Sequence, residues 1–364
     1  MIRVGIIGAS PERSWAALAH VPALKALSDY KITAISTTRK ETANAAARAY
    51  GAALAFDKHE ELVAHPEVDL VVVCVKVPHH FSLVLAALDA GKHVYCEWPL
   101  GVNLEEAITM TERAEMAGVR TAVGLQARSS PTITYVKDLI RGGYVGGVLS
   151  TTLVGTGMRW GAELSQHNAY LANKANGATM LSIPFGHTVD AMCLCLGEFA
   201  SLNATLAVRR KTATVVETGE VVQVTSDDQV AVSGILTSGA VASIHYRGGT
   251  VRGHNLLWEI VGTEGELHLT SESGNAQMFP LSLSGARSGD KALKPLSLPP
   301  EYTAGVVGLP TVVATVACAY RLFANDIRTG SKSIPDFADA VVRHRMLATI
   351  EKAAQTGERQ KLSD

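Results

Sequence analysis

Glu97, Trp98 and Pro99 follow a short apolar run that is typical of a buried strand, and they make a sharp turn at its end. Proline has a fixed φ and no N–H, and it holds the residue before it in extended geometry. In open α/β folds, ligands bind at the carboxyl edge of the sheet, where this turn would lie. We therefore expect these three residues in a pocket for a substrate or cofactor, although capping of a strand explains them equally well.

His187 is a candidate general base, because a neutral imidazole accepts an alcohol proton near pH 7 while hydride leaves for a nicotinamide. A helix histidine bonded to a neighbour is the alternative. Lys76 ends the strand before the one that leads to Glu97, so its ammonium would stabilise a developing alkoxide or contact a phosphate, a ribose or solvent. His79 and His80 follow it, but adjacent histidines diverge and lack a carboxylate partner at helical spacing, so we predict no metal site.

Another group of residues would form the far wall of the pocket. Arg159, Trp160 and Tyr170 lie between a predicted strand and the helix that carries His187. An arginine beside aromatic rings suits a sugar or an acidic sugar, while a loop packed on its own tryptophan explains the same residues. Arg128 precedes another helix and would either position substrate or cap that helix.

The first turn of the chain resembles a dinucleotide-binding turn. A strand at 4–7 is broken by Gly8 and followed by a helix at 15–24, which matches the first glycine of the dinucleotide fingerprint but not the later ones. Free N–H groups at a helix start favour a phosphate, although an ordinary βα turn has the same pattern. The expected cofactor contacts here are Gly8, Ala9, Ser10, Arg13 and Trp15.

The end of the second strand, at 32–35, bears on the choice of cofactor. An NAD enzyme usually carries an acid there for the ribose 2′-hydroxyl, whereas this chain has hydroxyls and cations, which suit the 2′-phosphate of NADP or a polar helix cap. We expect NADP rather than NAD. The contacts expected from this and the two central strands are Ser36, Thr37, Thr38, Arg39, Val75, Lys76, Pro78, His80, Glu97 and Trp98.

Helical and strand patterns alternate up to Gly124, which predicts a doubly wound parallel sheet. The helices are expected at 41–50, 60–64, 81–90 and 104–117, and the further strands at 70–75, 94–96 and 121–124. After a helix at 131–140, strands follow one another with turns between them, which indicates an antiparallel sheet. These strands are expected at 149–155, 202–208, 221–225, 229–236, 241–245, 257–261 and 266–269, before closing helices at 309–329 and 335–356.

We therefore predict two domains: a Rossmann domain at 1–124 and a substrate-binding and oligomerisation domain at 125–364. The length of 364 residues supports two domains. Lys and Arg number 33 against 34 Asp and Glu, which gives nucleic-acid binding no support. The five cysteines are odd in number and lie in apolar segments, so we expect a reducing, cytoplasmic compartment. No apolar run reaches the roughly 18 residues of a membrane helix.

Several motifs together resemble the glucose-fructose oxidoreductase and inositol dehydrogenase family, called Gfo/Idh/MocA. The resemblance covers nearly the whole chain and rests on residues 4–8, 91–100, 186–190, 262–267 and 343–345. It implies an amino-terminal Rossmann domain, a carboxyl-terminal domain on a large open antiparallel sheet, and NAD(P)-dependent oxidation or reduction of sugars and polyols. It also implies that the sheet builds a homodimer or homotetramer. Such an assembly would cover apolar strands such as 230–235.

Two positions depart from the family pattern. Trp98 stands where the family carries a lysine, and Ile183 stands where it carries an aspartate four residues before His187. Both departures resemble the branch that includes the fungal galactose-pathway repressor, which binds NADP and regulates through protein contact. We expect an NADP-dependent oxidoreductase acting on a small carbohydrate or related hydroxy or carbonyl compound. The alternative is a catalytically silent NADP-binding sensor that acts through a protein partner.

Overall fold

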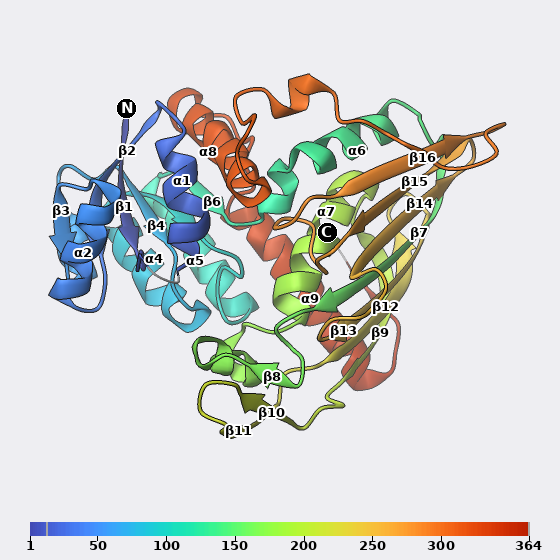
Figure 1. Cartoon of the computed structure of the whole chain (residues 1–364), viewed down its shortest axis with the longest axis horizontal. Coiled ribbons are helices and arrows are strands. Elements are labelled where there is room, and N and C mark those ends of the chain that lie inside the picture. Colours follow the sequence, from blue (N-terminus) through green and yellow to red (C-terminus); the bar gives the residue numbers. More distant parts are fainter. Residues whose placement is uncertain (12–13, 363–364) are drawn as a thin grey trace. The chain divides into compact units, whose positions relative to one another are not determined.

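The computed structural model describes residues 1–11 and 14–362 of the chain (Figure 1). The chain divides into two compact units. Unit 1 comprises Met1–Ser129 and Val306–His344, and unit 2 comprises Ser130–Gly305 and Arg345–Asp364. Helix α9 (Phe337–Thr356) begins in unit 1 and continues into unit 2.

Unit 1 is built on a six-stranded parallel sheet in the order β3-β2-β1-β4-β5-β6, which confirms the predicted Rossmann-type sheet. All four residues of β4 are buried, as in a parallel sheet covered on both faces. Strand β3 was not predicted, because three half-buried residues at a sheet edge are too few to form a pattern. The strands are β1 (Ile2–Ile7), β2 (Tyr30–Ser36), β3 (Leu54–Phe56), β4 (Leu70–Val73), β5 (His93–Cys96) and β6 (Thr121–Val123).

Helices cover both faces of this sheet. Val4 and Ile6 of β1 point into one helical layer, and a Cβ on Gly5 between them would lie 2.7 Å from Cδ2 of Leu62 on the other side. The first layer contains a π-helical turn (Ala16–His20), α1 (Val21–Lys25), α2 (Lys40–Tyr50) and α8 (Thr311–Thr329). The second contains α3 (His59–Ala64), α4 (His80–Asp89) and α5 (Leu104–Ala117). Short 3₁₀ turns follow β4 (Val77–His79) and β6 (Gln126–Ser129).

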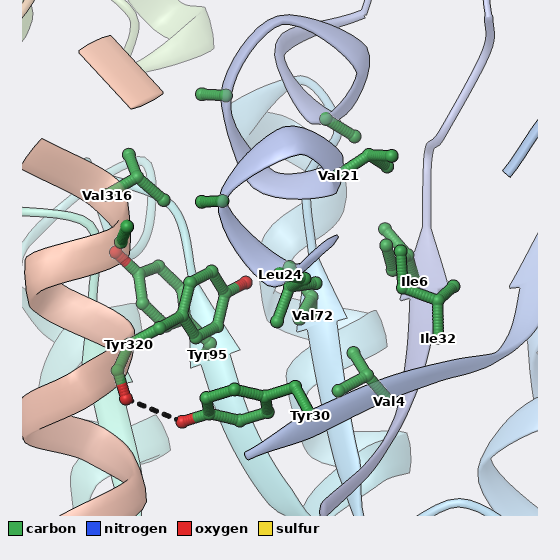
Figure 2. Packing of buried hydrophobic residues seen from close by; sticks show 14 of the residues in the cluster. Val4, Ile6, Val21, Leu24, Tyr30, Ile32, Val72, Tyr95, Val316 and Tyr320 are labelled. Atoms are coloured by element: carbon green, nitrogen blue, oxygen red, sulfur yellow. Dashed lines mark hydrogen bonds between the residues drawn. The ribbon is translucent and has the colours of Figure 1, made fainter. Parts of the chain in front are cut away.

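Helix α8 packs into the core of unit 1, which corrects the prediction that residues 309–329 close the second domain. Tyr320 of α8 lies 5.0 Å from Tyr95 of β5 between ring centroids, and Tyr30 donates a hydrogen bond of 2.7 Å to the Tyr320 carbonyl oxygen (Figure 2). Val316 lies one turn away on the same buried face. The apolar stripe of α8 therefore completes the sheet's first layer, although it comes from a segment far along the chain.

Unit 2 is built on a nine-stranded sheet in the order β17-β16-β15-β14-β7-β13-β12-β9-β18. All neighbouring strands are antiparallel except β7 and β13, so the prediction of a large antiparallel sheet is confirmed with one parallel pair. The strands are β7 (Val148–Gly157), β9 (Phe199–Ala207), β12 (Gln229–Leu236), β13 (Val241–Gly248), β14 (Leu256–Gly262), β15 (Gly265–Ser271), β16 (Ser282–Arg287), β17 (Lys294–Pro295) and β18 (Gln360–Lys361).

A separate three-stranded sheet has the order β11-β10-β8. It contains β8 (Glu163–Leu164), β10 (Thr212–Val215) and β11 (Val221–Gln223). The strand predicted at 221–225 therefore lies outside the large sheet. The other two strands of this sheet, β8 and β10, are short, which explains why they were not predicted.

One face of the large sheet carries helices. Helix α7 (Gly186–Leu196) follows a π-helical turn (Leu181–Phe185), and α6 (Pro131–Arg141) packs on α7. Phe185 meets the ring of Tyr246 in β13 edge-on, with centroids 5.6 Å apart. The Thr188 hydroxyl accepts a 3.3 Å hydrogen bond from the backbone N–H of Ala276. Further 3₁₀ turns span Gln166–Ala172, Lys174–Asn176 and Pro300–Thr303.

The premise that residues 230–235 expose apolar surface is wrong. Val230 and Val232 are buried within the unit, because alternate residues of a strand face opposite sides, and Ala231 and Ser233 are exposed instead. The other face of β12 carries Gln229, Ala231, Ser233 and Ile235, of which Ile235 is half-buried. Among the described residues, we find no helix long and apolar enough to cross a membrane.

Candidate functional site

The carboxyl edge of the unit 1 sheet gathers the ends of β1, β2, β4 and β5. Gly8 follows β1 with φ +97°, and its N–H donates to the Ser36 carbonyl oxygen at 3.0 Å. A Cβ on Gly8 would lie only 2.3 Å from the Cys74 carbonyl oxygen and 2.6 Å from Cγ1 of Val75. Only glycine fits this close approach of two strand ends.

The other predicted cofactor contacts of the first turn differ in their exposure. Ala9 is buried, Ser10 is exposed, and Trp15 packs partly buried against the core. The Ser14 hydroxyl donates to the Ser10 carbonyl oxygen at 2.6 Å and accepts from the Ala17 N–H at 3.1 Å, which ties the turn to the helix start. Arg13 lies outside the described residues.

The residues after β2 divide into internal and outward-facing groups. Ser36 is buried, and the Thr37 hydroxyl donates to the Arg39 carbonyl oxygen at 3.0 Å, so these two hydroxyls serve the local fold. Lys40 donates to the Ala55 carbonyl oxygen at 2.7 Å. Thr38 and Arg39 are exposed, and no other described residue engages the Arg39 guanidinium. The Arg39 guanidinium is therefore available to bind an anion at this edge.

His80 joins the ends of β4 and β5. Its Nδ1 lies 2.9 Å from the Pro99 carbonyl oxygen, and its Nε2 lies 3.1 Å from that of Val75. Burial lowers the pKa of His80, while the two carbonyl contacts oppose that shift. The buried His80 therefore connects the two strand ends within the fold. Pro78 is exposed, and Lys76 is half-buried after β4.

Trp98 is 4% exposed and stacks at a tilt on His344 of α9, with ring centroids 4.8 Å apart. The ring is thus packed in unit 1, and its role as a pocket wall stays a prediction. Arg128 is also engaged, because its Nη1 lies 2.9 Å from Oδ1 of Asp339. This ion pair ties the turn after β6 to the start of α9.

The Trp98 contact leads to a prediction on pH. Burial lowers the pKa of His344 to about 4, against about 6.5 in an unfolded chain. Unfolding therefore takes up a proton between these values, so stability is full above pH 6.5 and falls by up to about 3 kcal/mol as pH drops to 4. Urea unfolding at several pH values should show this slope, and His344→Phe should make it shallower, while the buried His80, whose pKa is also lowered, keeps its own contribution. The exposed His254→Gln should keep the slope, and an unchanged slope in His344→Phe would contradict the assignment.

Glu97 lies at the centre of a hydrogen-bond network that was not predicted. Its Oε1 is 2.8 Å from Nε2 of His20, and both carboxylate oxygens accept from Nε2 of Gln126, at 2.9 and 2.8 Å. Nδ1 of His20 lies 2.7 Å from the Tyr320 hydroxyl. His20 and Tyr320 are 300 residues apart, so no local pattern could have revealed the network.

Unit 2 carries the other predicted site residues. His187 is 4% exposed in the first turn of α7, directly after a π-helical turn that contains Pro184. Arg159 and Trp160 line a hollow that also includes Leu171. Burial raises the pKa of Tyr170, and the Arg159 cation opposes the shift.

The same hollow contains two residues that were not predicted, Arg210 and Asp228. The buried Asp228 carboxylate accepts from the backbone N–H groups of Arg209 and Arg210, at 2.7 and 2.8 Å. This arrangement displays a short basic loop beside Arg159 and Trp160. Asp228 is the second of two aspartates directly before β12, a position that carried no signal of this role.

Comparisons with known proteins agree with these two units. Residues 2–125 match the Gfo/Idh/MocA model, described as an oxidoreductase family with an NAD-binding Rossmann fold, and residues 131–271 match the C-terminal domain of Gal80p. The dehydrogenase aclE of Aspergillus oryzae is 30% identical over 98% of this chain and 97% of its own length. A levoglucosan dehydrogenase of Pseudarthrobacter phenanthrenivorans is 27% identical over 64% of this chain and 63% of its own.

The galactose/lactose metabolism regulatory protein GAL80 of Saccharomyces cerevisiae is 28% identical over 98% of this chain and 93% of its own. A solved structure of a super-repressor mutant of that protein aligns with a TM-score of 0.90, at 25% identity, over 100% of this chain and 98% of the other. Both matches cover the whole fold and confirm the resemblance. The chain belongs to the Gfo/Idh/MocA family of oxidoreductases, with a nicotinamide-dinucleotide-binding Rossmann domain and a Gal80p-like carboxyl-terminal domain.

Proposed function

We propose that the protein is an NADP-dependent oxidoreductase that transfers a hydride between the nicotinamide and a sugar, a polyol or a related hydroxy or carbonyl compound. The observation that carries the proposal is the carboxyl edge of unit 1. There Gly8 approaches the end of β4 too closely for a side chain, and beyond β2 Arg39 presents a guanidinium that contacts no other residue within 1–11 and 14–362 through a hydrogen bond or ion pair. A narrow glycine turn suits a pyrophosphate, and the guanidinium suits a 2′-phosphate.

In the proposed mechanism, the bound cofactor supplies the hydride acceptor or donor. Gly8, Ala9 and Ser10 would hold its pyrophosphate, and Arg39 its adenosine end. His187 would take the hydroxyl proton of the substrate, since a neutral imidazole is a suitable base near pH 7. Lys76, at the end of β4, would stabilise negative charge that develops on the substrate oxygen.

A carbohydrate is the proposed substrate. Arg159 and Trp160 line one hollow of unit 2, and Tyr170 lies near the Arg159 cation. The guanidinium would donate to hydroxyl or carboxylate oxygens, and the rings would pack against a sugar face. Similarity to a levoglucosan dehydrogenase supports this substrate class. We further propose that the open face of the unit 2 sheet builds a homodimer or homotetramer, and that the five free cysteines reflect a reducing, cytoplasmic compartment.

Cofactor choice is tested at Arg39. Arg39→Ala should weaken NADPH binding about tenfold, because a charge-assisted contact to the 2′-phosphate is lost, and should leave NADH binding unchanged. Fluorescence titration of both cofactors gives the two affinities. Lys40→Ala is the matched control, because that neighbouring cation is already bonded to Ala55. Equal affinities of the natural protein for NADPH and NADH would refute the preference.

Turnover itself is tested by a screen of aldoses, polyols and sugar acids with NADP and NADPH, read by nicotinamide absorbance. Reduction or oxidation of the cofactor by one of these compounds is the expected result. Tight cofactor binding without turnover on any of them would overturn the enzyme assignment.

A regulator is the second candidate function. The observation that favours it is Trp98, an apolar ring packed on His344 at a position where the family carries a lysine. Similarity to the regulatory protein GAL80 supports it as well. Such a protein would bind the cofactor as a signal and act through a protein partner. Failure of turnover together with cofactor-dependent binding of a protein would favour this function.

A further inference from the structure

The carboxylate of Glu97 is held far more firmly than a strand-end side chain requires. His20 and Gln126 approach it from two elements, the helical turn after β1 and the turn after β6. A third side is closed by backbone, since a Cβ on Gly124 would lie 2.6 Å from Oε2 of Glu97. The side chain nevertheless keeps 12% exposure. Glu97 is therefore held from several sides, while a small part of it reaches the surface.

The hydrogen bonds of this network run in one direction. A carboxylate only accepts, so Nε2 of His20 carries the proton that it shares with Glu97. In the neutral ring Nδ1 is then an acceptor, and the Tyr320 hydroxyl donates to it at 2.7 Å. A tyrosine hydroxyl can donate or accept, so the Tyr320 contact is compatible with the tautomer that donates to Glu97 and holds the ring in position.

Aromatic rings hold the imidazole of His20 in place. Its centroid lies 5.3 Å from that of Tyr95 and 5.7 Å from that of Tyr320, with interplanar angles of 86° and 77°. Figure 2 shows the Tyr95 and Tyr320 rings side by side between the sheet and α8. His20 is fully buried, so it cannot itself reach a ligand at the open edge. An effect of His20 on a ligand must therefore pass through its neighbours: Glu97, 2.8 Å from Nε2, or Trp15, whose ring centroid lies 6.5 Å from that of His20.

We propose that His20 and Tyr320 are positioning residues that fix Glu97 as the acceptor for a hydrogen-bond donor on the nicotinamide riboside half of the cofactor. The inference rests on the proposed cofactor site at this edge. A carboxylate selects donors, which on that half of the cofactor are the ribose hydroxyls and the carboxamide NH₂. Prior fixation by His20 removes the rotamer entropy that a free glutamate would lose on binding.

The test compares NADPH and NADH with adenosine diphosphate, which lacks the nicotinamide riboside. His20→Phe should weaken binding of the dinucleotides about tenfold and leave adenosine diphosphate unchanged, because a hydrogen bond to a charged group is lost. Tyr320→Phe should weaken them about threefold. His20→Gln, whose amide nitrogen can replace Nε2, should restore most of the affinity. Glu97→Gln should abolish any further effect of His20→Phe in the double variant.

Tyr30→Phe is the matched control. It removes a buried hydroxyl from the same aromatic cluster, the one that donates to the Tyr320 carbonyl oxygen, without touching Glu97. It should lower the melting temperature and leave the ratio of dinucleotide affinity to adenosine diphosphate affinity unchanged.

Two results would overturn the inference: equal weakening of adenosine diphosphate by His20→Phe, or persistence of the His20→Phe effect in the Glu97→Gln background. If His20→Phe does not fold, Tyr320→Phe is judged by the same two criteria. The readout is binding, so a protein without turnover still gives an answer, and failure of the proposed oxidoreductase activity is recognised separately in the substrate screen.

Discussion

Gly8→Ala is expected to lower the affinity for NADPH and NADH roughly 100-fold, a loss of about 2.7 kcal/mol. A Cβ there would lie 2.3 Å from the Cys74 carbonyl oxygen, and the backbone holds φ +97°, a conformation that costs about 1–3 kcal/mol for other residues. Since the obstructing atom is backbone, the turn after β1 must move away from β4. Its N–H groups then leave the positions that would bind the pyrophosphate. Titration of cofactor fluorescence measures the loss.

Gly51→Ala provides the matched control. Gly51 has a similar φ of +80° at the end of α2, but a Cβ there would meet nothing within 4 Å. This variant carries the backbone strain without the clash, so it should lose about 1 kcal/mol of stability and keep full cofactor affinity. If both variants bind the cofactors like the natural protein, the glycine turn is not the pyrophosphate site.

His187→Ala is expected to lower kcat by about 10²–10⁴ on the best substrate from the screen. The imidazole would be lost as the base for the hydroxyl proton, while water is a poor substitute in an oriented site. Cofactor affinity should stay unchanged, because His187 belongs to unit 2 and the glycine turn belongs to unit 1. Steady-state kinetics and cofactor titration on one preparation separate the two effects.

Val189→Ala, two residues further along α7, is the control for simple loss of packing. Val189 is fully buried, so its truncation should lower stability by about 1–2 kcal/mol and leave kcat within about twofold. A rate for His187→Ala near that of the natural protein would remove His187 from the mechanism. A large loss of cofactor affinity in the same variant would instead indicate a structural role.

Local patterns were sufficient to predict most elements. A run of four apolar residues in β4 indicates a strand buried on both faces, and the alternation along β12 indicates a strand buried on one face. Both patterns involve only neighbouring residues, so they can be recognised in the sequence. Strand β3 was not predicted, because three half-buried residues show neither of these patterns. The alternation along β12 also showed that Val230 points inward, so the expectation of apolar surface there neglected a pattern already visible.

Tertiary partners could not be predicted in this way. The apolar stripe of α8 showed that one side of the helix is buried. It did not show that α8 packs on the sheet of unit 1 rather than on the sheet of unit 2, which is closer in sequence. Glu97 was singled out by its place at a strand end. His20 and Tyr320, which hold it, became visible only through contacts between segments 300 residues apart. For Trp98 and Arg128, the sequence suggested exposure to ligand, whereas His344 and Asp339 already contact them.

The discontinuity of unit 1 has a consequence for biosynthesis. Residues 1–129 leave the ribosome well before Val316, Tyr320 and Phe323 have been translated, so the nascent sheet lacks the helix that covers part of one face. That apolar surface remains exposed to water while segment 130–305 is being translated. Folding of the first sheet therefore cannot finish before synthesis of the second unit's main segment, and its first helical layer is completed only after α8 has been translated.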